Sequence, residues 1–133
     1  MRHDERGQIT VMTIGFLLFI GLLSVVVINS SAAFLQKQQL NNIADGAALA
    51  AADGLSLDDF YREGEVVLDD AEARRLVGRY VTAGDVRIAW VETSDDTVRV
   101  RLERTVGLAI RPPGWRSRTT IVSEATARLR AGP

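Results

Sequence analysis

The hydrophobic pattern begins with an uncharged apolar run over residues 9–28, with Arg6 before it and Lys37 as the next charged side chain after it. A helix needs about 20 apolar residues to cross the hydrocarbon core of a bilayer. The Leu, Ile, Phe and Val side chains of the run favour insertion by on the order of 6 kcal/mol in total. A soluble domain of this size could not cover such a helix on all sides. The pattern therefore predicts a single transmembrane helix over residues 9–28.

Beyond this run the periodicity changes, but no helix-ending residue occurs before Gly54. Apolar residues recur at spacings of three and four, which is one stripe of an amphipathic helix: Leu40, Ile43, Ala44, Ala47, Ala48 and Ala51. Alanine is the strongest helix former, and the first stop signal is Gly54. We expect one helix over residues 8–53, on the order of 70 Å long, which extends well beyond the bilayer.

Small residues along this helix are candidate contact points for another helix, because they let two backbones approach closely. The predicted helix-packing interface comprises Gly15, Gly21, Ser24, Leu40, Ile43, Ala44, Ala47, Ala48 and Ala51. The alanine stripe has a second interpretation of equal weight, in which the alanines face the protein's own domain.

After the long helix, residues 54–68 are predicted to form an acidic linker. Asp69 and Glu72 then have the spacing of a capping box, in which an N-cap acceptor is followed three residues later by an acid. The amphipathic segment that follows predicts a helix over residues 70–83, ended by Gly84.

The last third of the chain alternates with period two, which predicts β-strands. The alternating segments lie around residues 86–90, 98–110 and 121–129, and the turns around residues 94–96 and 112–114. The expected fold class is α+β: a long transmembrane helix that extends beyond the bilayer, then a small domain over residues 69–133. That domain would contain one helix and roughly three antiparallel strands, with helix 70–83 covering the apolar face of the sheet.

The residues needed for catalysis are missing from this pattern. There is no cysteine, and the only histidine, His3, lies in a charged leader of residues 1–7. The sequence has no Ser/His/Asp set, phosphate-binding glycine loop or metal-ligand cluster, so we expect no enzyme activity, no metal and no cofactor. The acidic pairs at residues 58–59, 69–70 and 95–96 are explained by a linker, a helix start and a turn.

Charge is distributed unevenly, with a net acidic segment over residues 38–84 and a net basic segment over residues 85–133. The basic segment lacks the aromatic interleaving of a single-strand binding surface, so we expect no nucleic-acid partner. Opposite charges on one molecule favour contacts with other subunits or with copies of itself.

The most site-like surface feature is the loop after Pro112-Pro113-Gly114, which presents an aromatic side chain among cations. Its candidate contact residues are Arg111, Trp115, Arg116 and Arg118. Such a loop suits anionic lipid headgroups or a polymer, and an ordinary edge loop is the simpler alternative because arginine is abundant throughout this chain.

Basic residues near the membrane favour one orientation. Arg2 and Arg6 precede the span and Lys37 alone follows it, so the positive-inside rule places the N-terminus in the cytoplasm and the C-terminal domain outside. Cleavage of a secretory signal near Ala33 is the alternative. It is disfavoured because the apolar run exceeds the ~7 to 15 residues of a signal core.

The N-terminal segment of the chain resembles a known protein family. The order Arg6-Gly7-Gln8, an apolar span, then residues 39–52 (Gln-Leu-Asn-Asn-Ile-Ala-Asp-Gly-Ala-Ala-Leu-Ala-Ala-Ala) resembles the N-terminal segment of TadE/TadG-like proteins. These belong to the tight-adherence (Flp) pilus-assembly system of bacteria. The resemblance implies a membrane-anchored pseudopilin or assembly component with an extracytoplasmic domain, processed between Gly7 and Gln8 if it follows pilin-like substrates.

Two residues depart from that family pattern. Pilin-like substrates carry Glu at the fifth place after the cleavage glycine, where this chain has Met12. Gly46 stands where the family more often has Ala, which loosens the helix by about 1 kcal/mol.

The sequence therefore supports two functional hypotheses. The first is a non-enzymatic, membrane-anchored, pseudopilin-like component of a Flp/Tad-type pilus-assembly or secretion apparatus. It would act by helix packing with pilin-like or other assembly subunits, or with its own copies. The alternative is a membrane-tethered extracytoplasmic domain that binds envelope polymer or lipid through the Trp115 loop.

Overall fold

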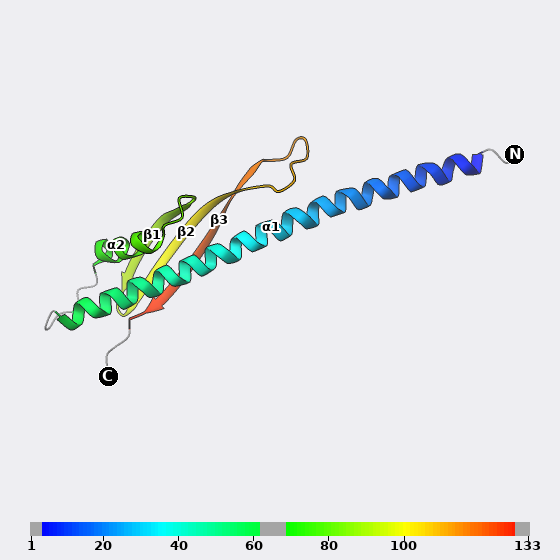
Figure 1. Ribbon diagram of the computed structural model, residues 1–133. Helices are drawn as coiled ribbons and strands as arrows, with labels where there is room; N and C mark the ends of the chain where they lie inside the picture. The colour runs from blue at the N-terminus through cyan, green and yellow to red at the C-terminus, as the bar shows by residue number, and fades with distance from the viewer. Residues whose placement is uncertain (1–3, 62–68, 130–133) are drawn as a thin grey trace.

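The computed structural model describes residues 4–61 and 69–129, which form two helices and three strands. The helices are α1 (Asp4–Tyr61) and α2 (Asp70–Tyr80), and the strands are β1 (Val86–Ser94), β2 (Thr97–Gly107) and β3 (Arg118–Arg128). Figure 1 shows α1 as a rod, with the sheet and α2 packed along its C-terminal half only. The predicted α+β class, with a long N-terminal helix, a short second helix and a three-stranded antiparallel sheet, is confirmed.

The predicted end of the long helix at Gly54 is wrong, because α1 continues to Tyr61. Gly54 has a packing role instead: a Cβ built on it would lie 2.8 Å from Cδ1 of Leu76 in α2. The residue thus lets α2 approach the side of α1. The predicted linker over residues 54–68 is helical up to Tyr61, and residues 62–68 lie outside the described part of the chain.

The predicted start of α2 is confirmed. Asp69 has an extended backbone and its Oδ1 accepts a hydrogen bond of 2.9 Å from the backbone amide of Ala71, which is an N-cap. The helix ends at Tyr80 and not before Gly84, because Val81 leaves the helical conformation (φ −80°, ψ 88°). Gly84 lies in the turn into β1, where the amide of Val86 donates to the carbonyl of Ala83.

The sheet is a simple antiparallel meander in the order β1-β2-β3. Ser94 pairs with Thr97 across the tight turn between β1 and β2, and Asp95 there has φ 49°, a left-handed conformation that Asp tolerates better than most residues. Gly107 pairs with Arg118 at the other end of the β2–β3 pair. The turns expected around residues 94–96 and 112–114 are both present.

The core lies between the inner face of the sheet and α1. Buried residues of α1 and β2 belong to one cluster. They are Leu40, Ala44, Ala47, Ala48, Ala51, Ala52 and Leu55 on the helix and Val98, Val100 and Leu102 on the strand. The expectation that the helix at residues 70–83 covers the sheet is therefore only partly right. α1 crosses β2 and β3, while α2 packs against α1 and β1. Alanines make this arrangement favourable because their small side chains let the helix axis approach the sheet closely.

Candidate functional site

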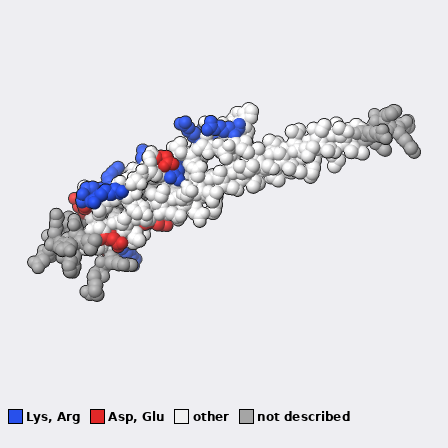
Figure 2. All heavy atoms as spheres, in the orientation of Figure 1, with Lys and Arg blue, Asp and Glu red and all other residues white. Residues whose placement is uncertain are grey.

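The N-terminal half of α1 makes no contribution to the core. The described side chains from Gly7 to Ser24 are exposed, including large apolar ones such as Met12, Phe16 and Phe19. Figure 2 shows this part of α1 as an uncharged rod. In the described residues one helix, Gly7–Ser56, is long and apolar enough to cross a membrane, and its most apolar window is 0% buried within the protein. The exposed apolar rod is therefore a candidate membrane span.

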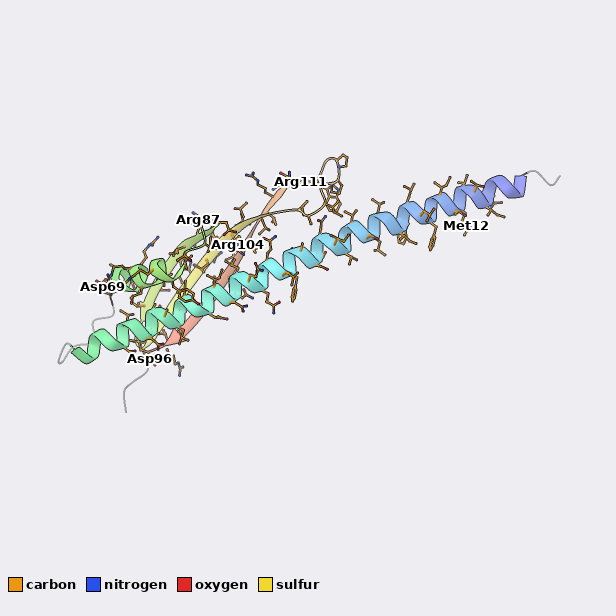
Figure 3. All side chains as sticks on the ribbon, in the orientation of Figure 1. Met12, Asp69, Arg87, Asp96, Arg104 and Arg111 are labelled. Carbon is orange, nitrogen blue, oxygen red and sulfur yellow. The ribbon has the colours of Figure 1, made fainter. Side chains whose placement is uncertain are left out.

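The proposed processing site lies at the start of this rod. Gly7 and Gln8 are exposed and already helical, one turn into α1. A Cβ on Gly7 would meet no atom within 4 Å. Met12, at the fifth place after Gly7, is also exposed (Figure 3).

The alanine stripe is occupied by the protein's own domain. Leu40, Ala44, Ala47, Ala48 and Ala51 are each at most 1% exposed beneath the sheet and α2. Ile43 is partly buried against the same core. Of the two interpretations of this stripe, the structure therefore has the intramolecular one, and the expectation that these residues contact a partner helix is corrected. The spacing alone could not decide, because one helix face serves either purpose.

The small residues within the span do not share one face of α1. Gly15 and Gly21 are six positions apart, which separates them by about 120° around a helix. Gly21 and Ser24 are three apart and lie on neighbouring positions of one face. A Cβ on either glycine would meet nothing within 4 Å, so both leave open space at the surface. Only the pair Gly21 and Ser24 can serve the same partner helix.

A longer row that sequence reasoning missed continues from Gly21. Every seventh residue on this side of α1 is exposed, and the row consists of Gly21, Ile28, Leu35, Asn42 and Leu49. Leu35 and Leu49 are 58% and 52% exposed although they lie beyond the predicted span. A seven-residue spacing keeps side chains on one helix face with a drift of about 20° per repeat. The spacing was visible in the sequence, but the adjacent alanine stripe gave the stronger apolar signal.

Polar contacts hold the sheet in register along α1. Oγ of Ser123 donates to Oδ1 of Asn41 at 2.6 Å, and Nζ of Lys37 donates to the backbone carbonyl of Val122. One buried arginine, Arg104, supports the same interface: its Nη1 donates to Oε1 of Gln39 in α1 at 3.5 Å, and its Nε lies 2.9 Å from Oδ2 of Asp85 in the turn before β1. These contacts fix which end of the sheet faces the membrane-spanning part of α1.

The β2–β3 loop, residues 108–117, is the part of the domain nearest that span. Nδ2 of Asn29 donates to the carbonyl of Ile110, and the amide of Ile110 donates to Oδ1 of Asn29, both at 2.9 Å. Arg111, Trp115, Arg116 and Arg118 are all exposed in or beside this loop. Figure 3 places Arg111 at one end of the sheet and Asp96 at the opposite end. The four predicted contact residues are therefore brought together next to the helix.

Nothing in the described residues resembles a metal centre, since no group of three or more His, Cys, Asp or Glu there could hold an ion. The carboxyl of Asp70 has a displaced pKa, and its contacts are structural. The hydroxyl and the backbone amide of Thr93 both donate to Oδ1 of Asp70 and lower the pKa of that carboxyl from its ordinary value.

Comparison with known protein families gives a match within α1. Residues 7–54 match the model of the Tad family, described as "Putative Flp pilus-assembly TadE/G-like". No curated protein and no solved structure matches the chain. The matched residues comprise the exposed apolar rod and the alanine stripe, and stop short of α2 and the sheet. The resemblance seen in the sequence is thus confirmed over residues 7–54, which match the TadE/G-like family of Flp pilus assembly.

Proposed function

We propose that the chain is a non-enzymatic, single-span membrane component of a Flp-type pilus-assembly apparatus, in which α1 packs beside pilin-like helices. The observation that carries this proposal is the family match over residues 7–54. Within that segment, the rod from Gly7 to Ser24 is exposed and apolar, and the remainder of α1 supports a small domain. A molecule of this form can be held in a membrane while it presents a helix face and a domain to other subunits.

The helix face that we assign to partners is the row Gly21, Ile28, Leu35, Asn42 and Leu49. Helices associate within lipid by close packing, for which small residues are the natural contact points, and Gly21 with Ser24 supplies them inside the span. Seven-residue spacing is what side-by-side packing of two long helices requires. Outside the span, Leu35 and Leu49 would be buried by such a partner, which explains why a soluble surface carries two large apolar side chains there.

We also propose that the N-terminus lies in the cytoplasm and that α2 and the sheet lie outside the membrane on the far side. Arg2 and Arg6 before the span outnumber Lys37 after it, which supports this orientation by the positive-inside rule. A cysteine placed at Asp96, at the far end of the sheet, would then react with a membrane-impermeant maleimide in intact cells. Labelling only after cell lysis would contradict the orientation.

Replacement of Gly21 and Ser24 by Leu tests the helix-packing function. Two large side chains on this face would hold a partner backbone away by several ångströms, and we expect at least a tenfold loss of co-purification with pilin-like subunits, on the order of 1.4 kcal/mol or more. Insertion should persist because Leu is more apolar than Gly or Ser. Cross-linking and co-purification from membranes measure the result.

The matched control is Gly15→Leu, which repeats the Gly-to-Leu half of the double variant in the same membrane segment but on a different face of α1. This variant should assemble normally. Equal loss of partners with Gly15→Leu and with the double variant would show that bulk anywhere in the span is harmful. Normal pilus assembly by the double variant would argue against the proposed face.

A further inference from the structure

The position of the β2–β3 loop along α1 points to a second contact with the membrane. Contacts between the sheet and α1 progress from Asn41 with Ser123, to Lys37 with Val122, to Asn29 with Ile110. Asn29 directly follows the predicted span of residues 9–28. The polar headgroup zone adds about 5 to 7 Å on each side of the hydrocarbon core. The β2–β3 loop, which Ile110 joins to Asn29, is therefore at the level of the headgroups when α1 spans the bilayer.

The chemistry of the loop fits that level. Trp115 is 55% exposed and Ile110 is 37% exposed, and tryptophan is enriched where membranes meet water. Arg111, Arg116 and Arg118 are exposed around them, and no acidic residue occurs between Glu103 and Glu124. Among the residues that the structure describes, none of these three arginines forms an ion pair within the chain. Figure 2 shows positive side chains gathered where the sheet borders the uncharged rod.

The loop is also held in shape. The amide of Trp115 donates to the carbonyl of Pro112 at 3.3 Å, with Pro113 and Gly114 between them and φ 84° at Gly114, which are the features of a type II turn. The amide of Leu108 donates to the carbonyl of Ser117 and closes the base of the loop. With the two bonds to Asn29, these contacts keep Trp115 and the arginines together before any ligand is present, so little ordering cost opposes binding.

We propose that this loop docks on anionic phospholipid headgroups of the leaflet from which α1 emerges, with Trp115 in the headgroup zone and the three arginines on phosphates. Docking gives the protein a second membrane anchor beside the span. Interfacial Trp and Arg side chains restrict the tilt and rotation of a membrane helix. The loop therefore determines the direction in which the row from Gly21 to Leu49 faces. An envelope polymer is the less favoured ligand, because the loop faces the membrane end of the domain and not its outer end.

The inference does not depend on the pilus function and requires only that α1 inserts. To test it, the full chain carrying Trp90→Phe, which leaves Trp115 as the single tryptophan, is reconstituted in phosphatidylcholine vesicles with or without phosphatidylglycerol. Acyl chains brominated near the headgroup quench a tryptophan at that depth. We expect strong quenching and protection from acrylamide in the anionic vesicles, and less of both in the neutral ones.

The second part of the test removes the positive charges of the loop. In Arg111→Ala/Arg116→Ala/Arg118→Ala, each lost arginine should lower the ratio of docked to undocked loop by roughly fivefold in anionic vesicles, with a matching loss of quenching. The control Arg74→Ala/Arg79→Ala/Arg128→Ala removes the same charge from exposed positions outside the loop and should leave quenching unchanged. Vesicle flotation shows separately that every variant is inserted.

Three results would overturn the proposal. The first is a Trp115 that is as accessible to acrylamide in both kinds of vesicle as in detergent, and the second is equal quenching in neutral and anionic vesicles. The third is protection of Trp115 only after soluble peptidoglycan fragments are added, which would assign the loop to a polymer. A protein that does not float with the vesicles is not inserted, and this result would also contradict the proposal. Loss of pilus assembly with normal quenching of Trp115 would contradict only the proposed function.

Discussion

At the scale of single residues, Gly46 shows how a departure from the family pattern can be a packing requirement. A Cβ built at Gly46 would lie 2.6 Å from Cζ and 2.9 Å from Cε1 of Tyr80, the last residue of α2. The ring of Tyr80 therefore rests directly on the backbone of α1. The glycine costs the helix about 1 kcal/mol relative to alanine, and in exchange the aromatic ring packs against the helix.

This pairing predicts a strong coupling between the two positions. Gly46→Ala alone should fail to stabilise the protein, because Tyr80 must leave its place to make room for the methyl group. In a Tyr80→Ala background the same change should stabilise α1 by about 1 kcal/mol through helix propensity. A double-mutant cycle by chemical unfolding in micelles should give a coupling energy on the order of 1 kcal/mol. Equal effects of Gly46→Ala in both backgrounds would refute the contact.

Residue roles of this kind were only partly predictable. Asp69 was recognisable as an N-cap because the cap uses a local contact with Ala71. The packing roles of Gly46 and Gly54 did not follow from the sequence, because each is determined by a side chain of α2 that is distant in sequence. Arg104 interrupts the apolar alternation of β2, and its ion-pair partner Asp85 lies in the turn before β1, which the local pattern does not reveal.

At the scale of elements, α2 is joined to β1 by a charged hydrogen-bonded contact. The Asp70 carboxylate at the start of α2 accepts from the hydroxyl of Thr93 and from its backbone amide at 2.8 Å. Both bonds favour the ionised form and lower the pKa of Asp70 below 3.8. A pKa that is lower in the folded state stabilises the fold above the unfolded-state value, and this contribution is lost as pH falls through the folded-state value.

We therefore expect the docking of α2 to weaken on acidification below pH 3.8 or so, and Thr93→Val to reduce that dependence. The valine variant lacks the hydroxyl donor, so the pKa of Asp70 should rise toward its ordinary value, as measured by NMR titration of the carboxyl carbon. Thr97→Val is the matched control, since the hydroxyl of Thr97 donates to the carbonyl of Ser94 and does not touch Asp70. An unchanged titration in Thr93→Val would exclude the hydroxyl as the cause.

The elements themselves followed from sequence to the extent that local patterns determine them. Alternation gave the strands, and Pro113 with Gly114 gave the turn between β2 and β3. The local patterns did not predict which helix covers the sheet. The alanine stripe has the same spacing whether it faces a sheet or a partner helix, and only the placement of Leu40 and Ala48 under β2 and β3 distinguishes them.

At the scale of the whole molecule, α1 serves two environments at once. Its first half is exposed and apolar, and its second half supplies one entire side of the domain core. The segment expected to form the small domain, residues 69–133, therefore lacks the helix that covers its sheet. Because one helix forms both the candidate span and one side of the core, a tilt of the proposed span would also reorient the sheet.

Fragments of the chain test whether the domain can exist without α1. Burial of Leu40, Leu55 and five alanines contributes on the order of 5 to 10 kcal/mol, which is comparable with the whole stability of a small domain. Residues 69–133 alone should therefore show no cooperative thermal transition by circular dichroism. Residues 36–133 should show one, because they keep the buried part of α1 and omit the exposed rod. A cooperative transition in the shorter fragment would mean that α2 and the sheet form a complete core, and that the buried face of α1 is available to other helices after all.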